Sequence, residues 1–326
     1  MGSIFRTRYR LLRPVEVRLN LHFRTFAQST IIARRRFPLT LAAGLISCRG
    51  TTNVSADAGT YDAFHTPEDV SITGYGGDAM EPFLTRDGHY LLFNNRNEPS
   101  ENTNLHWAQR VDDLTFSYLG EIPGVNTAAL EGVPSMDRDG NLYFVSTRSY
   151  QQTFSTIYRA RFVEGTASAP EIVDGISRRV PGWVNFDAEI SADGNTLYFV
   201  DGYFGAGNQP RSAILVAAAR SGTGFRRLTE TARLFANVNS NWLQYAPDVS
   251  ADELELFLTR VRRIEASAEP AIFRSVRERV DQPFSIPQRV SAIQGFAEAS
   301  TISPDGRSLY YHARLDGHLR IRRVTR

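Results

Sequence analysis

The chain has 326 residues, 42% of them hydrophobic and 22% charged, which is ordinary for a globular protein and excludes a disordered or collagen-like chain. All 37 basic residues are arginine, and ten of them lie in residues 1–50 with a single acid, Glu16. Residues 51–326 therefore carry 27 arginines against 34 acids, a net charge of −7, which disfavours nucleic-acid binding because that needs clustered positive charge.

The N-terminal region contains a predicted export signal. Arg34, Arg35 and Arg36 precede an apolar run, 37–46, that leads to Cys48, the only cysteine of the chain. Basic residues, a short apolar run and a small residue before the cleavage point are typical of a secretory signal, and the run is too short to span a bilayer. The L-I-S-C ending resembles the lipobox of bacterial lipoproteins, which implies lipidation at Cys48. The alternative is a plain signal peptide or short membrane anchor with an incidental cysteine.

The predicted signal covers residues 34–48. Residues 1–33, which precede it, have no packed-core pattern of their own. We expect residues 1–33 to be an extension or the result of a start codon placed too far upstream, and to be absent from the mature protein. Residues 49–60 are expected to form a polar tether. The signal is consistent with either Sec or twin-arginine export. Arg49 follows the cysteine where inner-membrane lipoproteins tend to carry aspartate, so we expect an outer-membrane protein.

One motif recurs five times along the rest of the chain. Each unit has an apolar strand, an acidic turn and a second apolar strand, and the turn aspartates are Asp87, Asp139, Asp193, Asp252 and Asp305. The steps between them are 52, 54, 59 and 53 residues. Asp-Gly supplies the positive φ angles of a tight hairpin, and the short Leu-Tyr-Phe runs that follow are typical of strands buried on both faces.

In chain order, each unit continues with a third and a fourth predicted strand. The third strands are expected at 105–107, 157–159, 214–216, 272–274 and 319–321, and examples of the more polar fourth strand at 171–173 and 287–290. Four strands per unit, arranged radially, form a propeller blade. The sequence therefore predicts an all-β protein with a single β-propeller of about five four-stranded blades over residues 61–326.

The fifth unit ends at Arg326 after its third strand, so its outer strand has to come from elsewhere. Residues 67–72 look like the other fourth strands, and we expect them to pair beside residues 319–321. That pairing closes the ring and removes an open sheet edge.

The repeat resembles the WD40-like (PD40) repeat of TolB-type propellers over about residues 67–326. The resemblance is closest at residues 191–199 and 302–311, where S-x-D-G precedes a Leu-Tyr aromatic strand. The fourth unit departs from the pattern with Glu253 in place of glycine, which puts its turn geometry in doubt. The resemblance implies the propeller fold, and the Tol-system function is not carried over with it.

Motifs for known chemistry are missing from the sequence. It has no G-x-S-x-G, H-E-x-x-H or C-x-x-C motif and no lysine-bearing phosphate loop. Residues 137–141 look like the start of a calcium loop, but Leu142 and Arg148 stand where the glycine and the last ligand are required. We therefore assign no catalytic residue, cofactor or metal from motifs.

The repeat places in-phase polar and aromatic residues at one end of the ring, which we expect to be the mouth of the central channel. The candidate ligand or partner-binding residues there are Glu81, Glu131, Trp183, Asn185, Asp187, Trp242, Gln244 and Glu298, with Arg148 and Arg314 nearby. Tryptophan beside amides is typical of sugar or peptide recognition. The alternative is structural, because acids and arginines also pair between blades and tryptophans also pack there.

Three functions remain open from the sequence. The first is a non-catalytic cell-envelope lipoprotein that presents its propeller to an envelope protein or a glycan, contacts the membrane through its lipid anchor alone and does not bind nucleic acid. The second is a glycosidase that uses channel carboxylates, as five-bladed propellers can. The third is a purely structural envelope protein.

Overall fold

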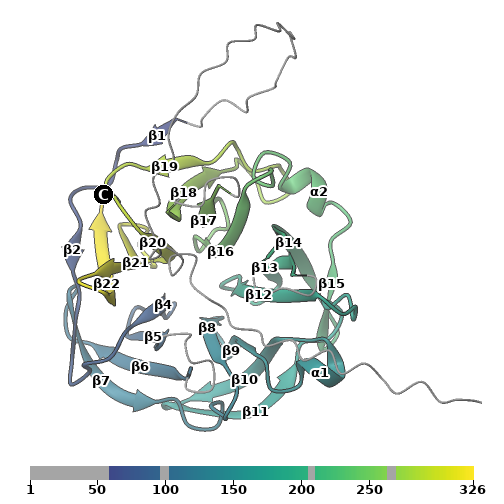
Figure 1. The fold of residues 1–326 in the computed structure, drawn as a ribbon, viewed down its shortest axis with the longest axis horizontal. Helices are drawn as coiled ribbons and strands as arrows, with labels where there is room; N and C mark the ends of the chain where they lie inside the picture. Colours follow the sequence, from purple (N-terminus) through teal and green to yellow (C-terminus); the bar gives the residue numbers. More distant parts are fainter. Residues whose placement is uncertain (1–58, 96–102, 205–209, 263–268) are drawn as a thin grey trace, which may run out of the picture.

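Five β-sheets are arranged around a common centre in the computed structural model, which describes residues 59–95, 103–204, 210–262 and 269–326 (Figure 1). Each sheet is a blade whose first strand lies nearest the centre and whose later strands lie progressively farther out. The predicted all-β, five-bladed propeller is confirmed.

The blades follow one another in chain order. The innermost strands are β4 (Met80–Leu84), β8 (Glu131–Met136), β12 (Trp183–Ile190), β16 (Leu243–Val249) and β20 (Ala297–Ile302). The second strands are β5 (Tyr90–Asn94), β9 (Asn141–Ser146), β13 (Thr196–Tyr203), β17 (Glu255–Val261) and β21 (Ser308–Leu315). The third strands are β6 (Leu105–Arg110), β10 (Ile157–Val163), β14 (Ser212–Ser221), β18 (Ala271–Val276) and β22 (His318–Thr325).

The outer strands are more varied. They are β7 (Thr115–Glu121), β11 (Thr166–Ile172), β15 (Gly224–Arg227), β19 (Gln288–Val290) and, for the fifth blade, β2 (Glu68–Asp69). Two short helices, α1 (Tyr150–Thr153) and α2 (Thr231–Leu234), connect strands at the periphery.

The apolar core lies between the blades because each second strand is buried on both faces. Leu142 and Phe144 on β9 join a cluster with Leu92 of the first blade. Tyr143, between them, packs with Leu197 and Phe199 of the third blade. A period-2 strand thus sends alternate side chains to its two neighbours, which explains why the Leu-Tyr-Phe runs are apolar throughout.

The acidic turns have one geometry in all five blades. Gly88, Gly140, Gly194 and Gly306 adopt φ between 72° and 79°. Glu253 takes the same left-handed conformation at φ 59°, and the Tyr198 hydroxyl donates to its Oε2 at 2.5 Å. The left-handed conformation is strained for Glu253 but not for the glycines of the other four turns. At Glu253 it is accompanied by a hydrogen bond to the neighbouring blade.

A β-bulge interrupts every innermost strand, and the sequence did not predict it. The bulged residues with positive φ are Glu81, Val133, Asp187, Ala246 and Ala299. Each stands six residues before the turn aspartate of its unit, so the bulges are in phase. A bulge redirects the side chains at one end of a strand, which here is the end at the predicted channel mouth.

The N-terminal segment closes the ring, as expected, but it does not form one strand over residues 67–72. β1 (Thr60–Tyr61) pairs in parallel with β19 of the fourth blade, β2 pairs with β22 of the fifth at Arg322 and Arg323, and β3 (Ser71–Thr73) pairs in parallel with β7 of the first. The expectation that Ser71 and Ile72 pair with the last strand is wrong, because the segment passes on to the next blade after Val70. It is a strap across three blades, and Thr60, the last residue of the predicted tether, is already part of it.

The predicted extension, the lipoprotein signal with Cys48 and most of the tether lie outside the described residues. Within the described ranges, no helix has the length and apolar character needed to cross a bilayer.

Candidate functional site

Hydrogen bonds between blades surround the channel at the level of the bulges. The backbone N–H groups of four bulged residues donate to side chains of the preceding blade in the ring. The pairs are Glu81 to His312 Nδ1 (3.2 Å), Val133 to Asn94 Oδ1 (3.0 Å), Ala246 to Asp187 Oδ2 (2.8 Å) and Ala299 to Thr259 Oγ1 (3.0 Å). The bulges therefore fix the position of polar side chains in the channel wall.

Three of the four predicted acids converge at this level. Asp187, Glu81 and Glu298 come from the third, first and fifth blades, and the two glutamates are close enough to raise the pKa of the Asp187 carboxyl. Glu298 accepts a hydrogen bond from the Tyr245 hydroxyl and lies 3.3 Å from His312 Nε2. Within the described residues, the contacts of Asp187 and Glu298 thus come from a backbone N–H, a tyrosine and a histidine instead of an arginine.

The surroundings of Asp187 raise the pKa of its carboxyl well above the ordinary value. Burial is the largest cause that raises the pKa of its carboxyl, the charges of Glu81 and Glu298 add to it, and the hydrogen bond from Ala246 opposes them. Burial and the same carboxylates also raise the pKa of Tyr245, which remains a hydroxyl donor. The cluster therefore places a carboxyl group with a raised pKa beside two further carboxyl groups.

The tautomer of His312 follows from its two contacts. Its Nδ1 accepts the N–H of Glu81, so the ring proton is on Nε2, which faces Glu298. His312 is fully buried. It stands seven residues after its turn aspartate, as Asn94 and Thr259 do, and so belongs to the ring of contacts between blades.

The fourth predicted acid, Glu131, does not join this cluster. Its buried carboxylate accepts hydrogen bonds from Thr127, from the Ser146 hydroxyl at 2.7 Å and from Arg148 at 3.2 Å. The guanidinium of Arg148 also lies over the Tyr158 ring. These contacts hold a loop of the second blade in place. Glu131 and Arg148 therefore have a structural role, as the alternative interpretation of the acids and arginines supposes.

The two predicted tryptophans lie at the same end of the ring and are partly exposed. The Arg178 guanidinium is 4.2 Å from the ring centroid of Trp183, and the Arg260 guanidinium is 4.6 Å from that of Trp242. Phe273 packs edge-on against Trp242. Both rings are held by neighbours yet keep some accessible surface, so neither is a fully buried packing residue.

The remaining predicted site residues have structural contacts. Asn185 is buried and donates to Asp201 at 2.8 Å, and Gln244 is buried and donates to Ser240 at 2.8 Å. The Arg314 guanidinium stacks over Phe296.

Tyr245 and His312 are not among the site residues predicted from the sequence, although the repeat register contains a signal for each. Tyr245 stands seven residues before its turn aspartate, as Glu298 does, and His312 stands seven residues after its own, as Asn94 and Thr259 do. We name the set of Glu81, Trp183, Asp187, Trp242, Tyr245 and Glu298 the channel-mouth surface. In the described ranges, no grouping of His, Cys, Asp and Glu could hold a metal ion.

Solved structures share the fold. A structure described as a glycoside hydrolase matches 82% of this chain and 92% of its own length, with 11% identity and a TM-score of 0.51. The chain is a β-propeller. TolB from Acinetobacter baumannii matches 76% of it with 14% identity and a TM-score of 0.44, and a putative TolB from Agrobacterium tumefaciens matches 75% with 16% identity and the same TM-score.

The likeness extends no further than the fold. The chain spans about half, 55%, of the length of the A. baumannii protein and 76% of the A. tumefaciens protein. No protein-family model matches the chain, and no curated protein sequence matches it.

Proposed function

We propose that this chain is an exported, lipid-anchored binding protein that recognises a glycan through the channel-mouth surface. The observation that carries the proposal is the placement of the carboxyl groups of Asp187 and Glu298. Uncharged donors hold them at the end of the ring where Trp183 and Trp242 are partly exposed.

A glycan fits this surface better than a charged partner does. Sugar rings present an apolar face that packs on tryptophan and hydroxyl groups that bond to carboxylates and to tyrosine. Glu81 and Tyr245 are the partly exposed polar members of the surface, whereas Asp187 and Glu298 lie behind them and are almost fully buried. The exposed pair would contact hydroxyls, and Glu298 orients Tyr245 by accepting the hydrogen bond of its hydroxyl.

A glycan array probed with the full chain tests this proposal. We expect oligosaccharide binding that Trp183→Ala and Trp242→Ala each weaken by at least tenfold. Trp107→Ala is the matched control, because Trp107 is also partly exposed but packs against Tyr90 and Phe162 at the second blade. Capture of an envelope protein without any glycan binding would show that the partner is a protein and that the glycan assignment is wrong. Unchanged oligosaccharide binding in both tryptophan variants would overturn the proposed binding surface.

The anchoring part of the proposal rests on Cys48 at the end of the signal. We expect the protein to label with palmitate, to partition into the detergent phase and to fractionate with the outer membrane. Cys48→Ser should abolish the labelling. Soluble, unlabelled wild-type protein would contradict the lipid anchor but would leave the proposed binding surface unaffected.

Glycoside hydrolysis is a second candidate, favoured by one observation. Burial and the neighbouring carboxyl groups of Glu81 and Glu298 raise the pKa of Asp187, and a carboxylic acid beside a carboxylate performs acid–base chemistry on glycosidic bonds. In this mechanism Asp187 donates a proton to the leaving oxygen as the glycosidic C–O bond breaks, and a glutamate carboxylate accepts a proton from the water that attacks the anomeric carbon from the opposite face.

Turnover separates this candidate from simple binding. A hydrolase should release reducing ends from a bound oligosaccharide, and Asp187→Asn should abolish the release while binding persists. Glycan binding without product after prolonged incubation would leave the non-catalytic function and exclude hydrolysis of that glycan.

A further inference from the structure

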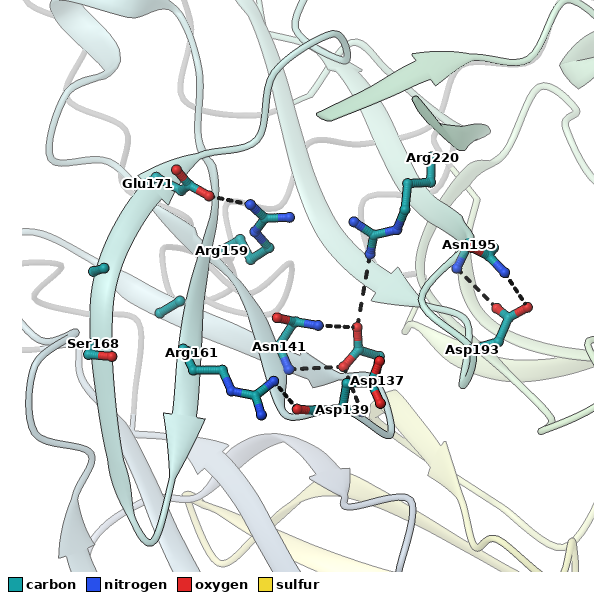
Figure 2. Close-up of a pocket in the computed structure, with 12 residues that line it drawn as sticks. Asp137, Asp139, Asn141, Arg159, Arg161, Ser168, Glu171, Asp193, Asn195 and Arg220 are labelled. Carbon is teal, nitrogen blue, oxygen red and sulfur yellow. Dashed lines mark hydrogen bonds and ion pairs between the residues drawn. The ribbon is translucent and has the colours of Figure 1, made fainter. Parts of the chain in front are cut away.

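A polar cavity of about 550 Å³ lies between the second and third blades, on the face of the ring that carries the acidic turns (Figure 2). Its volume is within the range of small-molecule sites. Figure 2 shows Arg159 and Arg161 on the wall formed by the second blade, Arg220 on the wall formed by the third, and the Asp137–Asn141 turn between them. The cavity is at the opposite end of the inner strands from the channel-mouth surface.

The buried or bonded acids of this cavity have little accepting capacity left. Asp137 is buried and accepts from the N–H groups of Asp139 and Asn141 and from the Asn141 side chain at 2.7 Å. Asp193 accepts from Ser191 and from Asn195. These contacts lower the pKa of Asp193 although partial burial opposes them. Glu171 pairs with Arg159.

Two of the cavity arginines, Arg161 and Arg220, make a contact that repeats in every blade. One arginine near the end of, or just after, each third strand donates to a backbone carbonyl of the acidic turn in its own blade. The pairs are Arg110 with Gly88, Arg161 with Asp139, Arg220 with Gly194, Arg277 with Glu253 and Arg326 with Gly306.

Arg161 departs from that repeat. Arg110 and Arg326 also pair with Asp113 and Glu255, and Arg220 and Arg277 donate to the hydroxyls of Tyr143 and Tyr198 in the preceding blade. Arg161 forms no ion pair within the described residues and is exposed at the cavity. Leu92 stands in the first blade at the strand position that Tyr143 and Tyr198 occupy in theirs, so Arg161 has no tyrosine acceptor there.

The cavity therefore offers guanidinium N–H donors on two walls, with the side chains of Asp139, Ser168 and Asn195 among its lining. A carboxylate would bind the arginines, above all Arg161, in the charge-assisted geometry that guanidinium favours. Hydroxyl groups on the same ligand would donate to Asp139 and bond to Ser168. We propose that this cavity is a second binding site for a small sugar acid, separate from the channel-mouth surface.

Calorimetric titration of the full chain tests the proposal with glucuronate, glucose and inorganic phosphate as probes. We expect glucuronate to bind at least tenfold more tightly than either of the others, because only glucuronate supplies both the carboxylate and the hydroxyls. Arg161→Gln should weaken glucuronate binding at least tenfold. Arg307→Gln is the matched control, because Arg307 is an exposed arginine on the acidic turn of the fifth blade.

Each other result has a defined meaning. Equal binding of glucuronate and glucose, no binding of glucuronate at millimolar concentration, or unchanged binding in Arg161→Gln overturns the site. Phosphate that binds as tightly as glucuronate overturns the sugar-acid assignment. Trp183→Ala should leave glucuronate binding unchanged, so failure of this site and failure of the channel-mouth proposal are distinguishable.

Discussion

At the scale of single residues, two acids are buried in the channel wall without an ion pair among the described residues. Asp187 contacts the N–H of Ala246, and Asp248 contacts the N–H of Ile302 at 2.8 Å. Burial is the largest cause that raises the pKa of both carboxyl groups, and the neighbouring charges of Glu81 and Glu189 respectively raise it further. Both carboxyl groups are therefore protonated more readily in the folded state than in the unfolded chain.

This arrangement predicts an unusual dependence of stability on pH. A carboxyl group with a raised folded-state pKa contributes stability that is fully present below its unfolded value of 3.8 and is lost as the pH rises. The unfolding temperature should therefore rise as the pH falls from about 7 towards about 4. Asp187→Asn should flatten this slope in scanning calorimetry, and an unaltered slope would contradict the assignment.

The turn aspartates act in the opposite direction at lower pH. The hydrogen bond from Ser303 is the largest cause that lowers the pKa of Asp305, and that of Asp87 is lowered by its bond to Thr85 although burial opposes it. Stability from a lowered pKa is present above the unfolded value and is lost as the pH falls through the folded value. Stability should thus decline again below about 4.

At the scale of elements, the acidic turn joins the first two strands of each blade and also contacts the neighbouring blade. At Gly194, φ is +73°, and a Cβ atom there would lie 2.7 Å from Asp137 Oδ2 of the second blade. The geometry of the turn at Gly194 therefore reflects packing between blades as well as the tightness of the hairpin.

Gly194→Ala should consequently destabilise the protein by more than backbone strain alone. Gly222, in the turn between β14 and β15 of the same blade, has φ +60°. A Cβ atom there would meet no atom within 4 Å, so Gly222→Ala is the matched control. We expect about 1–2 kcal/mol from the left-handed conformation in both variants and a further loss in Gly194→Ala. Equal free energies of unfolding in urea titrations would show that the contact with Asp137 is unimportant.

At the scale of the whole molecule, the strap formed by β1, β2 and β3 holds the fourth, fifth and first blades together (Figure 1). The backbone N–H of Val70 donates to Ile321 at 3.1 Å, and Arg323 pairs with Glu68 at 2.8 Å. The strap is thus the closure of the ring, and it supplies the fourth strand that the end of the chain does not.

Val70→Pro should weaken this closure, because proline removes the N–H that bonds to Ile321. Thr66→Pro is the control, since Thr66 is exposed and lies between the paired positions. We expect the melting temperature to fall by several degrees in Val70→Pro and to change little in Thr66→Pro. Equal melting temperatures would mean that β2 contributes little to closure.

The repeat made the blades, their strands and the closure of the ring predictable, because each depends on local periodicity and turn chemistry. The bulges and the division of the strap at Val70 depend on hydrogen bonds between blades, which a repeat in one chain does not reveal. Glu81, Asp187 and Glu298 could be grouped from their positions in the repeat. The hydrogen bond that Glu131 accepts from Ser146, which keeps it out of this group, could not be predicted from the repeat.

Hydroxyl-radical footprinting of the tryptophans tests the channel-mouth surface most directly. Trp107, Trp183 and Trp242 are all partly exposed, so each should be oxidised in the free protein, and Trp107 serves as an internal control. With the oligosaccharide that binds most tightly on the array, Trp183 and Trp242 should become protected while Trp107 is oxidised as before. Protection of Trp107 alone, or equal oxidation of all three with the ligand bound, would contradict binding at the channel mouth.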